Sequence, residues 1–243
     1  MLSWPAVGAW DADGIAIMGE TAVGYRSGQQ RARLTTLFLW ASIAVSAILV
    51  PVTAWEFNLW GRIGAAAEVS VAEAELSDGV SMVLGLLDLG ILIGTGITFL
   101  MWFHRVRANL PALGISDARW SPGWAVGWWF VPVMSLFRPY QVAAEIWRAS
   151  DPAATPMDWT TRPVAPLLGW WWGLFIASVI TDQISFRMWM RVDENTPSGF
   201  MQNLVALDIA TAVIDLAGAW LAIRVVAEIE RRQTDRWRLL AFT

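Results

Sequence analysis

Four long apolar segments limit the folds that are open to this chain. Each holds roughly 20 or more predominantly apolar residues, the length that an α-helix needs to cross the hydrocarbon layer of a bilayer. The segments are residues 34–55, 80–103, 166–186 and 200–226. The composition agrees with membrane insertion, because 56% of the residues are hydrophobic, 16% are charged and the mean hydropathy is +0.46. The sequence therefore predicts an all-α, polytopic membrane helix bundle with four transmembrane helices.

The parts outside these segments are polar and differ in character. Residues 1–25 are expected to form a flexible N-terminal tail, and residues 26–243 a single membrane domain. The first twenty residues hold neither an arginine nor an unbroken apolar run, so no cleavable signal peptide is expected. Residues 61–79 carry several carboxylates and are expected to form a polar, partly helical loop between the first two spans.

Residues 122–137 form a fifth apolar run, and arginine positions indicate that it does not cross the membrane. The run is uncharged and contains five aromatic side chains together with Pro122 and Pro132. Positive residues near the ends of spans are retained in the cytoplasm. If the run crossed, Arg138, Arg148 and Arg162 would face outward and the later spans would invert. We therefore expect an interfacial or shallowly re-entrant Trp/Pro-rich element, followed by a short amphipathic helix over residues 139–150, between the second and third spans.

The same arginine distribution predicts that both termini are cytoplasmic. In this orientation only Arg62, Arg187 and Arg191 lie outside. The arginines assigned to the cytoplasmic side are Arg26, Arg31, Arg33, Arg105, Arg107, Arg119, Arg138, Arg148, Arg162, Arg231, Arg232, Arg236 and Arg238.

Several kinds of chemistry are excluded by the residue inventory. The chain has no cysteine, and His104 is its only histidine, so thiolate metal sites, cysteine nucleophiles and multi-histidine metal sites cannot form. No nucleophile elbow, zinc-protease motif, phosphate loop or dinucleotide fingerprint occurs. The net charge of -4 argues against a nucleic-acid partner. We therefore predict no catalytic residue, no metal, no cofactor and no enzymatic activity.

Aspartates inside the predicted spans form the first candidate site. Ionisable side chains within a membrane are costly and need a structural or functional reason. They lie in polar stripes at helical spacing, and Asp88 and Asp208 are expected at a similar depth, where they could face each other. No arginine lies at mid-span. Two interpretations remain open, interhelical polar contacts or a proton, cation or small-solute path. The candidate intramembrane site consists of Asp88, Asp182, Asp208 and Asp215.

The Trp/Pro-rich element supplies the second candidate site, a loop for a lipid or small ligand. Indole rings favour the headgroup level of a membrane, so the simpler interpretation is that they anchor the protein and pack the loop. The alternative is an aromatic pocket for a lipid, quinone or cation, in which arginine would suit a phosphate. The candidate residues are Trp124, Trp128, Trp129, Arg138 and Tyr140, with Arg105 and Arg107 at the inner end of the second span.

A small-residue face on the second span predicts close helix packing. Gly90, Gly94 and Thr98 are four residues apart and lie on one side of the helix. Such a face can serve within the monomer or in a homo-oligomer.

Two sequence blocks carry a family resemblance. The block "WFHRVRANLPALG" (residues 102–114), followed by "SPGWAVGWWFVPVMSLFRPYQVAAEIWRAS" (residues 121–150), resembles a bacterial membrane family catalogued as domain of unknown function 4328. The likeness extends from about Tyr25 to Glu230, and Ser135 stands where the family usually has asparagine. The resemblance implies a multi-pass protein of the bacterial inner membrane with a cytoplasmic Trp/Pro loop. It implies no activity and no catalytic residue.

Together these features predict an integral inner-membrane protein without enzymatic activity. Its expected partners are the lipid bilayer and a protein, anionic lipid or small ligand bound by the aromatic loop. The alternative is a proton, cation or small-solute transporter or channel that uses the intramembrane aspartates. Four spans per chain would then require a homo-oligomer to enclose a path.

Overall fold

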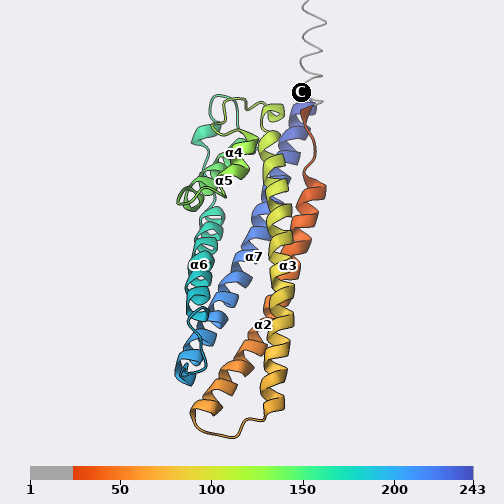
Figure 1. Ribbon diagram of the computed structural model, residues 1–243. Coiled ribbons are helices and arrows are strands. Elements are labelled where there is room, and N and C mark those ends of the chain that lie inside the picture. The colour runs from red at the N-terminus through yellow and green to blue at the C-terminus, as the bar shows by residue number, and fades with distance from the viewer. Residues whose placement is uncertain (1–23, 243) are drawn as a thin grey trace, which may run out of the picture. The chain divides into compact units, whose positions relative to one another are not determined.

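A computed structural model describes residues 24–242, and this range is helical without any β-strand. Four long helices account for most of it (Figure 1). They are α2 (Gln29–Gly64), α3 (Val71–Ala108), α6 (Pro166–Trp189) and α7 (Ser198–Ala241). Between α3 and α6 lie the short helices η2 (Pro111–Leu113), α4 (Pro122–Gly127), η3 (Met134–Leu136), α5 (Arg138–Ala149) and η4 (Trp159–Thr161).

The prediction of an all-α fold with four membrane-length helices is confirmed. Each of the four long helices is long and apolar enough to cross a membrane. The segment between α3 and α6 holds no helix of that length, and its longest helix is α5 with 12 residues. The predicted tail at residues 1–25 lies outside the described residues except for its last two positions.

The connection between α2 and α3 is shorter than the sequence predicted. Residues 61–79 were expected to be a partly helical loop, but only residues 65–70 are outside the two helices. The side chain of Arg62 near the end of α2 forms an ion pair with Glu73 in the first turn of α3. The Ser70 hydroxyl accepts the Glu73 backbone N–H at 3.1 Å. A capping hydroxyl and an acidic side chain both stabilise a helix N-terminus, so the carboxylates extend α3 instead of breaking it.

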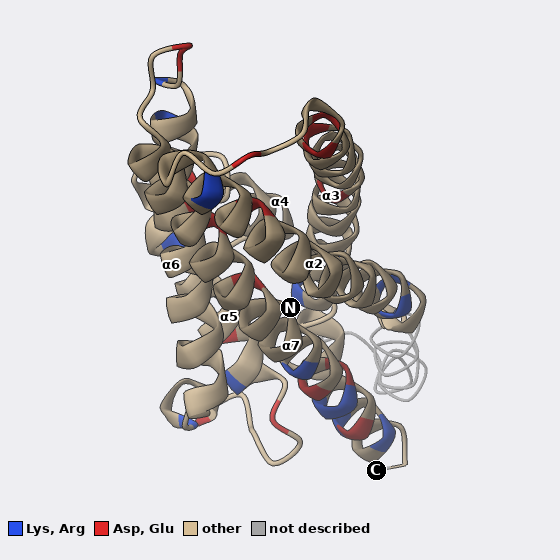
Figure 2. Ribbon diagram, turned by 90° about the horizontal axis from the view of Figure 1, so that it is seen from below, with Lys and Arg blue, Asp and Glu red and all other residues tan. Residues whose placement is uncertain are grey.

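The charged end of α7 also remains helical, well beyond the predicted span end at residue 226. Glu228 lies 2.7 Å from Arg231 and 2.9 Å from Arg232, and Arg231 lies 3.2 Å from Asp235. Pairs three or four residues apart each stabilise a helix by about 0.2–0.5 kcal/mol. Figure 2 shows acidic and basic residues alternating along this end of α7.

The chain divides into two compact units. We call residues 33–99 and 165–226 the helix unit, and residues 24–32, 100–164 and 227–242 the loop unit. In the helix unit each long helix contacts two others. These contacts include Phe38 with Gly94 (α2–α3), Phe99 with Trp171 (α3–α6), Leu174 with Gly218 (α6–α7) and Phe57 with Gln202 (α2–α7).

The two glycines of the small-residue face on α3 have different surroundings. A Cβ atom added to Gly94 would lie 2.2 Å from the ring of Phe38, so α2 and α3 approach closely there because Gly94 has no side chain. A Cβ added to Gly90 would meet nothing within 4 Å. Gly94 therefore serves packing within the monomer.

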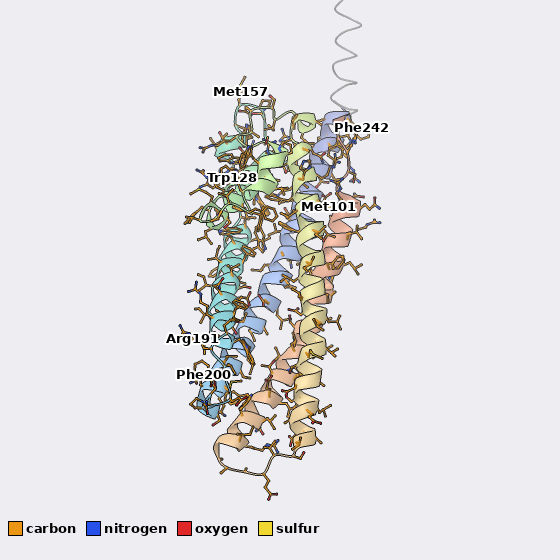
Figure 3. All side chains as sticks on the ribbon, in the orientation of Figure 1. Met101, Trp128, Met157, Arg191, Phe200 and Phe242 are labelled. Atoms are coloured by element: carbon orange, nitrogen blue, oxygen red, sulfur yellow. The ribbon has the colours of Figure 1, made fainter. Side chains whose placement is uncertain are left out.

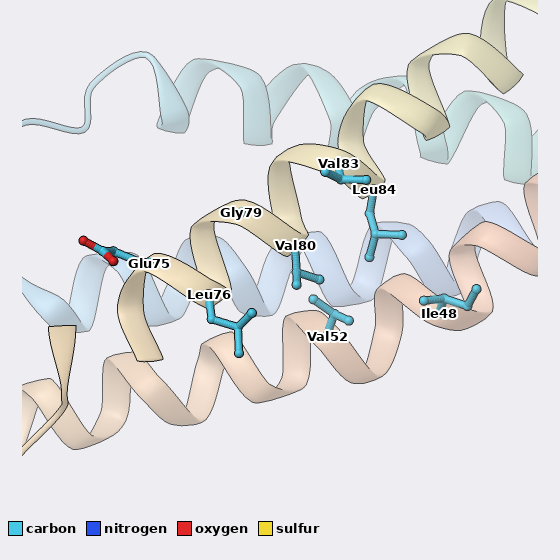
Figure 4. A pocket seen from close by; sticks show the side chains of 8 residues that line it. All are labelled: Ile48, Val52, Glu75, Leu76, Gly79, Val80, Val83 and Leu84. Atoms are coloured by element: carbon cyan, nitrogen blue, oxygen red, sulfur yellow. The ribbon is translucent and has the colours of Figure 1, made fainter. Parts of the chain in front are cut away.

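An open apolar groove of about 420 Å³ lies between α2 and α3 in the helix unit (Figure 4). Its only charged lining residue is Glu75. The rest of its lining is Ile48, Val52, Leu76, Gly79, Val80, Val83 and Leu84.

The loop unit has a core of its own, built from the end of α3, the short helices and the end of α7. Tyr25 at the start of the described chain stacks on Trp237 near its end, with ring centroids 4.8 Å apart. Both described ends of the chain therefore belong to one unit. Its almost fully buried apolar side chains include Trp102, Phe103, Val106, Leu110, Leu113, Ile115, Val142, Ile146, Trp147 and Ile229.

Gln233 of α7 is the polar centre of this core. It is 1% exposed, donates to the backbone carbonyl of Val106 at 2.8 Å and to the Ser150 hydroxyl at 3.1 Å, and accepts from the Asn109 amide at 3.2 Å. Asn109 in turn donates to the Arg26 carbonyl at 3.0 Å. One side chain thus links α3, α5 and α7, and Asn109 extends this link to the segment before α2.

Replacing Gln233 should destabilise the loop unit. Gln233→Ala leaves a buried carbonyl, a hydroxyl and an amide without their partner, so we expect a loss of about 2–4 kcal/mol in unfolding free energy. Thermal unfolding in detergent measures the effect. The control is Gln30→Ala, which removes an exposed side chain of the same type. Equal melting temperatures for the two variants would contradict this role of Gln233.

Candidate functional site

The Trp/Pro-rich element is a series of short turns set by its sequence. The Ser121 hydroxyl caps α4 by accepting the Trp124 backbone N–H at 3.3 Å, and Pro122 occupies the first turn, where its missing N–H is not needed. Val133 has φ 64°, a conformation rare for a β-branched residue, and leads into η3. The predicted short helix over residues 139–150 is observed as α5, and its residues 142–147 are all buried.

Three indole rings and two guanidinium groups gather around α4. We call Trp120, Trp124, Trp128, Arg119 and Arg138 the Trp–Arg cluster. The ring centroids of Trp124 and Trp128 lie 4.8 Å apart, and those of Trp120 and Trp128 lie 5.2 Å apart. The Arg138 guanidinium lies 5.0 Å from the Trp120 ring and 5.6 Å from the Trp128 ring, while that of Arg119 lies 4.6 Å from Trp120. These distances are within the range of attractive cation–π contacts.

Two groups of the Trp–Arg cluster have N–H donors that no described residue accepts. The buried indole N–H of Trp128 (Figure 3) has no hydrogen-bond partner in the part of the chain that the structure describes. Arg138 donates to the Gln141 side chain at 2.8 Å and forms no ion pair with any described residue. A guanidinium carries five N–H donors, so Arg138 can still bind an anion.

Several large apolar side chains are exposed in residues 124–137, the part of the sequence that contains Trp124 and Trp128 and directly precedes Arg138. The segment 124–137, which we call the apolar segment, contains Phe130 at 71% and Phe137 at 56% exposure. Exposed apolar surface of this size commonly marks an interaction or membrane site. The remaining large apolar side chains exposed in the segment are Trp124, Val133 and Leu136.

The other residues predicted for the ligand loop are placed elsewhere. The ring of Trp129 packs edge-on against Phe103 at 6.1 Å, which attaches the loop to α3. Tyr140 is half-buried on α5. Arg105 is only partly exposed and lies within electrostatic range of Arg26 and Arg31.

Arg107 is buried and therefore unsuited to a headgroup at the surface. It donates to the Ala118 carbonyl at 3.0 Å, and its Nε lies 3.9 Å from Oε2 of Glu145 on α5. The other Glu145 oxygen accepts the Arg119 backbone N–H at 2.5 Å. Burial raises the pKa of Glu145 above its ordinary value, and the Arg119 N–H and Arg107 offset part of that rise. Glu145 thus fixes the backbone that carries Arg119 and Trp120.

The sequence interpretation missed Arg119, Trp120 and Glu145. No pattern in the sequence marked Glu145 as buried, because it shares the polar stripe of α5 with Gln141 and Arg148, four and three residues away.

The predicted intramembrane aspartates lie in the helix unit and pair with serines. Ser178 of α6 donates to Asp215 of α7 at 2.5 Å, and Ser185 of α6 donates to Asp208 of α7. The Trp189 indole N–H adds a bond to Asp208 at 3.1 Å. The serines are seven residues apart, as are the aspartates, so two antiparallel helices bring the pairs into register two turns apart. This equal spacing is the sequence signal that could have predicted the pairs.

The neighbours of Asp88 are carboxyl groups other than that of Asp208, which the sequence analysis had suggested. It lies within electrostatic range of Asp182 and Asp215, while Asp208 lies within range of Asp182 and of Glu56 on α2. Glu56, which also hydrogen-bonds Trp60 and Ser81, was not predicted for the site. Across residues 24–242, no group of His, Asp and Glu side chains is arranged to hold a metal ion.

Comparison with known proteins confirms the family resemblance. The model of the family described as domain of unknown function (DUF4328) matches residues 65–231, which include both sequence blocks that carry the resemblance. Comparisons with curated proteins and with solved structures found no match.

The buried Glu145 should give the loop unit a characteristic pH dependence. Because its folded pKa is raised, the folded protein binds this proton more tightly than the unfolded chain does. Glu145 therefore adds stability below the ordinary carboxyl pKa, and this contribution is lost as pH rises through the raised value. On going from about pH 7 to about pH 4, the melting temperature of the wild type should rise relative to that of Glu145→Gln.

Melting curves of both proteins in one detergent across this range measure the difference. Thr160→Ala, an exposed change in the same unit, serves as the control, and its difference from wild type should stay constant. A pH-independent difference for Glu145→Gln would contradict the buried-carboxyl interpretation.

Proposed function

We propose a function from the site geometry, starting from the fact that the chain belongs to the DUF4328 family, whose description names no activity. The protein acts as a non-enzymatic integral membrane protein. Its Trp–Arg cluster binds the phosphate headgroup of an anionic lipid at the cytoplasmic surface of the bacterial inner membrane.

The observation that carries this proposal is the state of Arg138. Its guanidinium lies over the Trp120 and Trp128 rings but has no carboxylate partner among the described residues. Other arginines of the loop unit, such as Arg162 and Arg232, are paired with acids. A planar cation held between aromatic faces presents its N–H donors in the arrangement that suits a phosphate.

The apolar segment supports a membrane-surface position. Trp and Phe side chains favour the boundary between headgroups and acyl chains, and basic side chains next to them are attracted by anionic lipid. Phe130, Val133 and Phe137 are exposed in the apolar segment, which directly precedes Arg138. Such an element would lie on the bilayer with its apolar side chains inserted.

The arginine distribution supports the cytoplasmic orientation of the loop unit. Twelve of the seventeen arginines belong to this unit, together with both ends of the described chain. Retention of positive charge in the cytoplasm supports an orientation with both termini inside. The twelve are Arg26, Arg31, Arg105, Arg107, Arg119, Arg138, Arg148, Arg162, Arg231, Arg232, Arg236 and Arg238.

Removing the charge of Arg138 should release the lipid. In nanodiscs of mixed phosphatidylethanolamine and phosphatidylglycerol, Arg138→Gln should retain about tenfold less phosphatidylglycerol than wild type, or about 1.4 kcal/mol. Arg138→Lys should fall between the two, because it keeps the charge but loses the planar donor set. Native mass spectrometry of protein released from the nanodiscs counts the retained lipid.

The matched control is Arg231→Gln, which removes an exposed arginine of the same unit that already pairs with Glu228 and Asp235. Its lipid retention should equal that of wild type. Equal retention by Arg138→Gln and wild type would exclude the proposed site.

A further inference from the structure

The contact between α6 and α7 contains a hydroxyl group shared by two carboxyl groups. Oγ of Ser178 lies 2.5 Å from Oδ1 of Asp215 on α7 and 3.3 Å from Oδ2 of Asp182, one turn along α6. The contact with Asp215 has the length of a strong hydrogen bond, and the contact with Asp182 is a longer and weaker one. The three side chains belong to the helix unit and therefore to helices that are apolar enough to cross a membrane.

The number of protons limits how these bonds can form. A serine hydroxyl carries one proton and can donate only one hydrogen bond, whereas an ionised carboxylate only accepts. If Asp182 and Asp215 were both ionised, one of the two contacts would lack a proton. Two simultaneous hydrogen bonds to Ser178 require that one of the carboxyl groups is protonated and donates to Oγ.

The surrounding charges favour the same protonation. From α3, Asp88 lies within electrostatic range of both carboxyl groups, and Asp208 of α7 lies within range of Asp182. From α2, Glu56 faces Asp208. None of these carboxyl groups forms an ion pair in the described range. Neighbouring carboxylates without a cation repel one another, and a bound proton relieves that repulsion.

A second polar group on α7 points to the same ligand. Thr211 is 6% exposed, and its buried hydroxyl has no hydrogen-bond partner in the described residues. It lies three residues after Asp208 and four before Asp215, so the three side chains share one face of α7. A buried hydroxyl without a partner is costly, and a carboxyl oxygen of this site would accept the Thr211 proton, because the single acid proton is already bonded to Ser178.

We propose that Asp182, Ser178 and Asp215 form a site that binds one proton between α6 and α7. In the bound state one carboxyl group is neutral and the other is ionised, with Ser178 between them. The proton changes sides in one balanced step. The O–H bond of the Asp182 acid breaks as its proton forms an O–H bond to Ser178, and the original Ser178 proton forms an O–H bond to Asp215. Asp182 is then ionised, Asp215 is neutral and the net charge is unchanged.

Infrared difference spectroscopy of the protein in nanodiscs tests this site, because the carbonyl stretch of a protonated carboxyl group is distinct and shifts in D₂O. Wild type should show such a band at about neutral pH, where exposed carboxyl groups are ionised. The double variant Asp182→Asn/Asp215→Asn keeps the shape of both side chains and should show a weaker band, because it removes this proton and leaves the other buried carboxyl groups unchanged. The control Asp193→Asn lies in the exposed connection between α6 and α7 and should keep it.

A second variant decides the outcome if the double variant does not fold. Ser178→Ala should retain the proton but shift the band, because the acid loses its hydrogen bond to Oγ. Absence of a protonated-carboxyl band in wild type, an undiminished band in the double variant, or an unshifted band in Ser178→Ala would each overturn the proposal. None of these results depends on lipid binding by the Trp–Arg cluster, so the two proposals fail separately.

Discussion

Backbone hydrogen bonding is the constraint on which this structure depends. In the hydrocarbon layer no water pairs with backbone N–H and C=O groups, so a segment that crosses it must satisfy them within itself. Helices α2, α3, α6 and α7 do so over lengths sufficient to cross a membrane. The Trp/Pro-rich element cannot, because two prolines and the turn at Val133 divide it into α4, η3 and irregular backbone. A segment equally apolar in composition thereby becomes a surface element with exposed aromatic side chains.

Polar side chains have opposite roles in the two units. In the loop unit many of them pair with one another, as in the contacts of Gln233 and the ion pair of Arg107 with Glu145, and Glu145 fixes the segment that carries Arg119 and Trp120. In the helix unit the carboxyl groups at the contact of α6 with α7 have hydroxyl partners but no cation in the described range. The first arrangement supports a rigid ligand site, while the second supports binding of a proton. The proposals of lipid binding by Arg138 and of proton binding by the aspartates of α6 and α7 both rest on side chains whose charge has no oppositely charged partner among the described residues.

The sequence predicted the elements of the fold better than their contacts. Span number and the short helix α5 follow from apolar length and helical periodicity, which are local properties. The extension of α3 to Val71 was missed because it depends on the ion pair between Arg62 and Glu73.

Arg107 was assigned to a headgroup site because a basic residue at a span end is usually exposed. Its partner, Glu145, is far away in the sequence. Of the candidate ligand residues, Trp124, Trp128 and Arg138 are brought together. The antiparallel register of Ser178 with Asp215 was readable from the equal spacing and from the short connection between α6 and α7, but the sequence analysis treated each polar stripe on its own helix.

The path of the chain around residues 122–137 is the central claim, and cysteine accessibility tests it most directly. The chain lacks cysteine, so single cysteines at Ser116, Met157 and Asn195 can be labelled with a membrane-impermeant maleimide in intact cells and in inverted vesicles. All three positions are exposed. The account predicts that positions 116 and 157 react only from the cytoplasmic side and position 195 only from the opposite side. Labelling of positions 116 and 157 from opposite sides would show that residues 122–137 cross the membrane and would contradict the account.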